Sequence, residues 1–163
     1  MIKMLASVRS AEEAELALDC SVDWIDVKDP STGALGAAAT STVIEIVDLV
    51  ARSRPVSATI GDSWDAPESI PAAVEAMSAC GVDYVKAGLN ACQVDGRSLN
   101  FVRDACALSR GLIIVCKAES PPRLADVSAL ADCGIRGIML DTAEKFGPGL
   151  TALLSLDYLE AFV

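Results

Sequence analysis

Four of the five lysines in this sequence lie at similar places along the chain. Each is found at the end of a short apolar, strand-like run or a few residues after it: Lys28, Lys86, Lys117 and Lys145. The carboxyl ends of parallel strands open onto one face of an α/β fold, and that face holds the active site. Ammonium groups gathered there, in a chain of net charge −10, predict a site for an anionic substrate, with an amine as a possible nucleophile. The alternative is that these lysines simply lie in solvated loops.

Residues 23–30 carry two of the candidate catalytic side chains. Side chains alternate along a strand, so Asp26 and Lys28 share one face while Ile25 and Val27 take the other. We expect the apolar pair to pack against helices. The carboxylate and the amine then point into the open end of the fold.

Two other strand ends add charged groups to the same region. Lys86 follows the apolar Val85, and Asp141, Thr142 and Lys145 follow the apolar run 137–140. When several ammonium groups share a pocket of low dielectric, one of them loses its proton more easily and can attack a carbonyl. Nearby carboxylates can then move protons on and off the resulting carbinolamine. A buried structural network of ion pairs would use the same residues, and this alternative stays open.

Four residues are weaker candidates for contact with substrate phosphate. Gly36 closes a small-residue loop whose backbone N–H groups could face an anion, and Arg9 ends the first expected strand. Asp62 follows the third expected strand, where a simple turn explains it as well. Thr142 directly follows Asp141.

Composition excludes several classes of protein. A strongly acidic chain without a basic stripe is not expected to bind nucleic acid or an anionic membrane surface. No apolar run reaches the ~18–20 residues of a membrane helix, and the N-terminus lacks a signal-peptide pattern, so we expect a cytoplasmic protein. The chain has no histidine, and its six cysteines form no C-x-x-C pair. We therefore expect neither a metal nor another cofactor, and read the cysteines as small buried residues.

Strand-like and helix-like patterns alternate along the whole chain. The expected strands are residues 3–8, 24–28, 56–60, 84–87, 112–116 and 137–140. The expected helices are residues 12–18, 41–51, 69–79, 98–108 and 123–131, with a last helix from beyond Gly149 to the C-terminus. Right-handed crossovers between such strands make the sheet parallel.

An internal repeat favours a barrel over an open sheet. The segments 19–23, 79–83 and 132–136 each place a cysteine where a helix ends and an even-numbered strand begins. A repeat of two βα units suits a barrel in which alternate strands fill successive interior layers. We predict one α/β domain, residues 1–163, of the TIM-type (β/α)8 barrel class, of which this chain supplies about six βα units. A doubly wound open sheet is the alternative.

Several segments resemble a known enzyme family. They are Leu5–Ser10, Glu12–Ala14, Ile25–Pro30, Gly33–Gly36, Val56–Asp62, Asp83–Leu89 and Met139–Lys145. In this order they are similar to the (5-formylfuran-3-yl)methyl phosphate synthases of methanofuran biosynthesis. The resemblance implies a (β/α)8 barrel, a lyase that condenses two molecules of glyceraldehyde 3-phosphate into a furan aldehyde phosphate with loss of phosphate and water. It also implies that Lys28 forms the Schiff base, with Asp26, Lys86, Asp141 and Lys145 around it.

The chain departs from the family pattern in two places. The family continues for about two more βα units, which carry the phosphate-binding loops expected after strands seven and eight. Residues 146–149 also replace a more polar turn. Six units leave two strand edges open, so we expect a homo-oligomer that binds a phosphorylated triose. Two rival functions remain: another Schiff-base aldolase acting on sugar phosphates, and a catalytically silent barrel fragment that binds a partner.

Overall fold

The computed structural model describes residues 3–61, 66–90, 94–143 and 147–163. Its sheet has six parallel strands in the order β1-β2-β3-β4-β5-β6, so each strand pairs with its neighbours in the sequence. The strands are β1 (Leu5–Val8), β2 (Trp24–Val27), β3 (Val56–Thr59), β4 (Tyr84–Gly88), β5 (Leu112–Lys117) and β6 (Gly137–Asp141).

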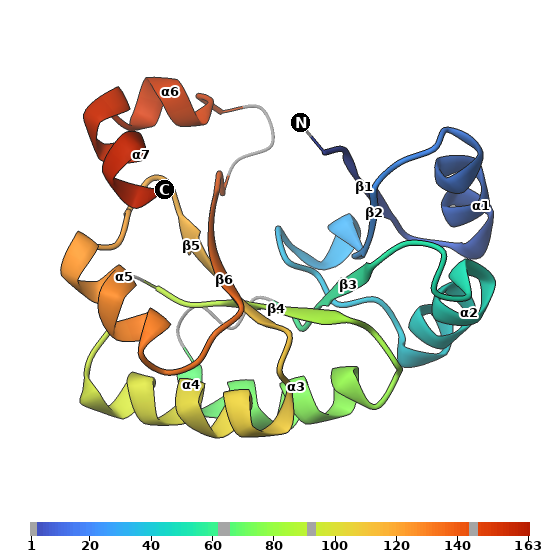
Figure 1. The fold of residues 1–163 in the computed structure, drawn as a ribbon, viewed down its shortest axis with the longest axis horizontal. Helices are drawn as coiled ribbons and strands as arrows, with labels where there is room; N and C mark the ends of the chain where they lie inside the picture. Colours follow the sequence, from blue (N-terminus) through green and yellow to red (C-terminus); the bar gives the residue numbers. More distant parts are fainter. Residues whose placement is uncertain (1–2, 62–65, 91–93, 144–146) are drawn as a thin grey trace.

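The helices all follow the outer side of a curled sheet (Figure 1). They are α1 (Ala11–Asp19), α2 (Thr40–Val50), α3 (Ile70–Ser78), α4 (Gly96–Leu108), α5 (Leu124–Ala131), α6 (Leu150–Leu153) and α7 (Leu156–Phe162), with short 3₁₀ turns at Pro30–Thr32 and Pro67–Ser69. A doubly wound sheet would carry helices on both faces and reverse its strand order. The sequential order and the one-sided helices exclude that alternative, and the architecture is a curled α/β half-barrel.

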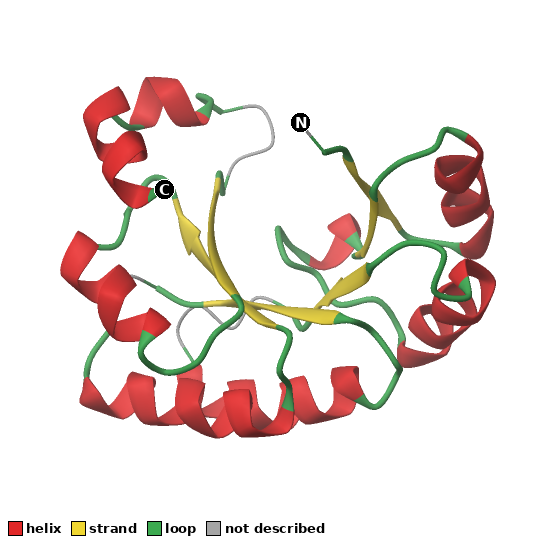
Figure 2. Ribbon diagram, in the orientation of Figure 1, coloured by secondary structure: helices red, strands yellow, loops and turns green. Residues whose placement is uncertain are grey.

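The predicted elements are all present, with ends that differ by no more than a few residues. The exception is the last helix, which is interrupted (Figure 2). Leu154 leaves the helical conformation, and Ser155 begins α7 by accepting a hydrogen bond from the N–H of Tyr158. A serine in this position is a strong helix start, and this signal separates α7 from α6.

The core lies between the sheet and its helices, as the alternation of β2 predicts. Ile25 and Val27 are fully buried, and Ile46 of α2 and Ile70 of α3 belong to the same cluster. Each such side chain contributes about 1.5–3 kcal/mol when it leaves water. None of the helices in the described ranges is long and apolar enough to cross a membrane.

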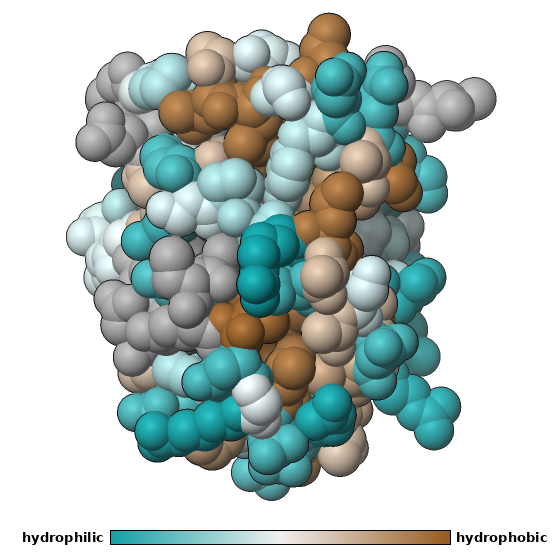
Figure 3. All heavy atoms as spheres, turned by 90° about the vertical axis from the view of Figure 1, so that its left-hand side faces the viewer, coloured by the Kyte–Doolittle hydropathy of each residue, from teal (hydrophilic) through white to brown (hydrophobic). Residues whose placement is uncertain are grey.

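The strands β1 and β6 form the two edges of the sheet, since each pairs with a single neighbour in the described part of the chain. Met4 and Leu5 at the β1 edge are 56% and 43% exposed. Beyond β6, apolar side chains gather on the face that carries α5 to α7 (Figure 3), where Leu124, Leu150 and Leu156 are exposed. Open edges and apolar surface of this kind favour association between chains.

We predict that a polypeptide of these 163 residues self-associates through the β1 edge. Leu5→Lys places a charge on that edge and should shift the sedimentation profile at low micromolar concentration toward the monomer. Leu16→Lys, on the exposed face of α1, is the matched control and should leave the profile unchanged. A wild-type chain that sediments as a monomer over this range would contradict the prediction.

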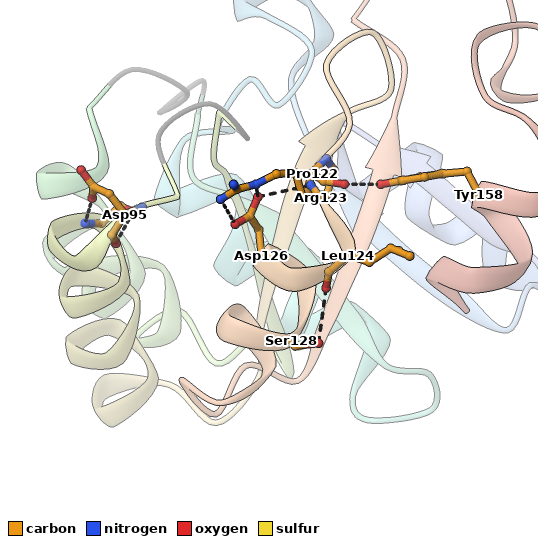
Figure 4. A network of polar contacts seen from close by, with 8 residues as sticks. Asp95, Pro122, Arg123, Leu124, Asp126, Ser128 and Tyr158 are labelled. Atoms are coloured by element: carbon orange, nitrogen blue, oxygen red, sulfur yellow. Dashed lines mark hydrogen bonds and ion pairs between the residues drawn. The ribbon is translucent and has the colours of Figure 1, made fainter.

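A charged network fixes the start of α5 (Figure 4). The carboxylate of Asp126 accepts hydrogen bonds from Nε of Arg123 at 2.8 Å, from its Nη2 at 2.7 Å and from its backbone N–H at 3.3 Å. These bonds from Arg123 lower the pKa of the Asp126 carboxyl. Next to them, the Tyr158 hydroxyl donates to the carbonyl of Pro122 at 2.6 Å, which ties α7 to the same loop.

The lowered pKa of Asp126 predicts a stability difference that depends on pH. The stabilisation that the Asp126 carboxylate provides is complete above the pKa of this group in the unfolded chain, near 4. It is lost as the pH falls through the lower pKa of the same group in the folded chain. Asp126→Asn should therefore reduce the free energy of unfolding by about 1 kcal/mol at pH 7, and the gap to wild type should narrow as the pH falls below about 4. Urea unfolding at several pH values measures this gap. Asp132→Asn, at the exposed end of the same helix, should show no such gap.

Candidate active site

A cavity of about 740 Å³ opens at the carboxyl ends of β1, β2 and β6. Four of the predicted site residues line it: Arg9, Lys28, Asp141 and Thr142. Lys28 directly follows β2, and Asp141 is the last residue of β6. The curl of the sheet therefore brings together residues more than a hundred positions apart in the sequence.

Two other predicted residues form a buried ion pair on the interior face of the sheet. Nζ of Lys86 lies 2.8 Å from Oδ1 of Asp26, and both side chains are only 4% exposed. Lys86 lies inside β4 rather than beyond its end, which is why it is so deeply buried. Neither residue lines the cavity described above.

Two serines complete the coordination of the buried carboxylate. The hydroxyl of Ser57 donates to Oδ1 of Asp26 at 2.5 Å, and the hydroxyl of Ser7 donates to Oδ2 at 3.2 Å. Neither serine was predicted from the sequence to belong to the site. Their signal is the register of the sheet, in which Ser7, Asp26 and Ser57 are direct neighbours on β1, β2 and β3. The predicted residues are therefore divided between two places: Asp26 and Lys86 form a buried ion pair, whereas Arg9, Lys28, Asp141 and Thr142 line the cavity.

Arg9 and Asp141 face the cavity from opposite edges of the sheet. Nε of Arg9 forms an ion pair with Glu13 at 3.0 Å, and its side chain remains 66% exposed. Oδ1 of Asp141 accepts a hydrogen bond from the N–H of Thr142 at 2.9 Å. Lys117 is the register partner of Asp141 on β5, so this carboxylate lies at the end of the strand next to another strand-end lysine.

Gly36 has a structural role in its loop. Its N–H donates to the carbonyl of Gly33, and its own carbonyl accepts from the N–H of Asp29 at 2.9 Å and the hydroxyl of Thr59 at 2.8 Å. A Cβ at Gly36 would lie 2.0 Å from the carbonyl oxygen of Asp29, so only glycine fits there. Gly33 and Ala34 line the cavity instead. The two remaining candidates, Asp62 and Lys145, lie outside the described residues.

The cysteines of the described chain offer no competing nucleophile in the cavity. Cys80, Cys116 and Cys133 are buried, Cys106 is half-buried and Cys20 is exposed. Burial raises the pKa of the Cys116 thiol to about 12, so it stays protonated at neutral pH. The expectation of small buried residues thus holds for three of these five, and Cys20 departs from it.

Comparison with known proteins adds to this geometry. A relative from Methylorubrum extorquens is 38% identical over 162 residues, which cover 99% of this chain and 66% of the relative. The (5-formylfuran-3-yl)methyl phosphate synthase of Methanopyrus kandleri is 32% identical, over 99% of this chain and 73% of its own. The chain thus spans about two thirds of the length of these relatives.

A solved structure and a family model give the wider relationships. The crystal structure of oxaloacetate acetylhydrolase matches 94% of this chain and 64% of its own with a TM-score of 0.63. At 18% identity this similarity concerns the fold alone. Residues 4–163 match the family model of 4-HFC-P synthase. The chain belongs to the 4-HFC-P synthase family.

Proposed function

We propose that the chain carries the active site of a synthase that makes (5-formylfuran-3-yl)methyl phosphate from two molecules of glyceraldehyde 3-phosphate, in methanofuran biosynthesis. The reaction proceeds through a Schiff base and releases phosphate and water. One observation carries the proposal: in a chain of this family, Lys28, Asp141 and Arg9 line a single cavity at the carboxyl ends of the strands. An amine, a carboxylate and a guanidinium are the groups that imine chemistry on a phosphorylated aldehyde needs.

Lys28 fits the role of nucleophile better than Lys86. A Schiff base requires a neutral amine that the substrate carbonyl can reach. Lys86 is buried in an ion pair with Asp26 and does not line the cavity, so a substrate carbonyl there cannot reach it. Lys28 is partly exposed and lines the cavity, and the described residues place no carboxylate in an ion pair with it.

We assign proton transfer to Asp141. It lines the same cavity as Lys28, whereas Asp26 is buried and accepts hydrogen bonds on both oxygens. Carbinolamine formation and dehydration each move a proton, and a carboxylate within reach can both take and return it. Asp26 then stabilises Lys86 rather than exchanging protons with substrate.

Phosphate binding is the third requirement, and Arg9 supplies it. Its ion pair with Glu13 uses Nε, so the planar guanidinium is oriented on the rim of the cavity. Guanidinium groups bind phosphate through paired hydrogen bonds. The backbone of Gly33 and Ala34 forms the neighbouring wall.

Borohydride trapping tests the nucleophile. With glyceraldehyde 3-phosphate present, reduction should leave the adduct on the peptide that contains Lys28, as measured by mass spectrometry. Lys28→Arg should abolish it, because a guanidinium stays protonated and cannot form an imine. Lys86→Arg is the matched control and should leave trapping on Lys28 intact. An adduct on Lys86 would overturn the assignment.

The product distinguishes the proposed synthase from its rivals. A furan aldehyde absorbs in the near ultraviolet, whereas an aldol product does not. Trapping without this absorbance would identify an aldolase acting on other sugar phosphates. Neither trapping nor absorbance would identify a catalytically silent fragment.

The two carboxylates should respond differently to replacement by asparagine. Asp26→Asn leaves the buried ammonium of Lys86 without its counter-charge and should reduce the free energy of unfolding by about 3–5 kcal/mol. Asp141→Asn removes a partly exposed carboxylate, so it should change stability by less than about 0.5 kcal/mol and lower turnover roughly 10²–10⁴-fold. Urea unfolding and the furan absorbance measure the two effects. Equal stability of both variants would contradict the assigned roles.

A further inference from the structure

A chain of hydrogen bonds connects the indole of Trp24, the first residue of β2, to the buried ion pair between Asp26 and Lys86. Nε1 of Trp24 donates to Oγ of Ser57 at 3.1 Å, and Ser57 donates to Oδ1 of Asp26 at 2.5 Å. The same oxygen contacts Nζ of Lys86 at 2.8 Å. Trp24 and Asp26 are two residues apart on β2, so both side chains lie on the interior face.

The chemistry of the indole fixes the direction of this chain. An indole N–H is a donor only, so the Ser57 oxygen must accept from Trp24. The single hydroxyl proton of Ser57 is then directed to Asp26. Ser57 is fully buried, and the Trp24 ring lies 4.5 Å from the Tyr84 ring, centroid to centroid. Ser57 is therefore held by the indole of Trp24 on one side and by the carboxylate of Asp26 on the other.

We propose that Ser57, oriented by the indole of Trp24, is a positioning residue that holds the Asp26 carboxylate on Lys86. Neither Ser57 nor Trp24 lines the cavity, so both act through Asp26. The carboxylate receives two donors on one oxygen, which prevents its rotation away from the ammonium group. This positioning does not depend on the proposed function.

The positioning can be measured without any activity, from the reactivity of Lys86. Trace acetylation with acetic anhydride, followed by peptide mass spectrometry, gives the labelling rate of each lysine. Ser57→Ala frees the carboxylate from one of its bonds, so Lys86 should label about fivefold faster than in wild type. Trp24→Phe keeps an aromatic ring against Tyr84, removes the N–H, and should change the rate in the same direction by a smaller factor.

A double variant tests whether Trp24 acts through Ser57. Since the indole bond ends on Ser57, adding Trp24→Phe to Ser57→Ala should not accelerate Lys86 labelling further. Thr59→Val is the matched control, because Thr59 is equally buried on the same strand but its hydroxyl donates to Gly36. Lys86 should label at the wild-type rate in this variant. Ser57→Thr keeps the hydroxyl and should also label at the wild-type rate, which separates the lost bond from a folding defect.

Wild-type labelling of Lys86 in both Ser57→Ala and Trp24→Phe would overturn the positioning role, as would additive effects in the double variant. If the labelling result holds while wild type forms no furan, the proposed function fails and the positioning stands.

Discussion

The structure depends most on the ion pair between Asp26 and Lys86. Burying two charges costs several kcal/mol per ion unless close geometry and further hydrogen bonds compensate. Here the ammonium lies 2.8 Å from the carboxylate, and Ser7 and Ser57 donate to its two oxygens. These four side chains come from β1, β2, β3 and β4. A shift in the register of β2 or β4 would separate the two charges, and a shift of β1 or β3 would remove a hydrogen bond from the carboxylate, so this cluster favours one alignment of the first four strands.

This alignment in turn sets the position of the reactive groups. Lys28 follows Asp26 by two residues, so it lies on the same face one layer nearer the strand ends. The Asp26 carboxylate, which pairs with Lys86, therefore lies one layer below the amine of Lys28, and Lys28 lines the cavity. This arrangement divides the lysines by environment: Lys86 is buried in an ion pair with Asp26, and Lys28 lines the cavity.

The sequence predicted most of the fold because the strand signals are local. Alternation along β2 correctly separated Asp26 from Ile25 and Val27, which are buried in the core. The sequence placed Asp26 and Lys86 in one cluster and left a buried network of ion pairs open, but it did not show which groups would pair, because the two belong to strands separated by β3 and meet only through the curl of the sheet. The structural role of Gly36 was also hidden, since it comes from the close approach of Asp29. Gly36 was predicted to contact phosphate, and this remains a prediction; in the structure Gly33 of the same loop lines the cavity.

The cavity combines groups from both edges of the sheet, although β1 and β6 do not pair with each other. The separation of Arg9 from Asp141 therefore depends on the curvature of the strands between them. Between the two edges, interior side chains of β2 and β4 meet across β3: Lys86 pairs with Asp26, and the rings of Trp24 and Tyr84 lie 4.5 Å apart, centroid to centroid. These contacts form only in a sheet that curls toward its interior face. The arrangement of Arg9 and Asp141 at the cavity therefore depends on contacts between side chains that do not line it.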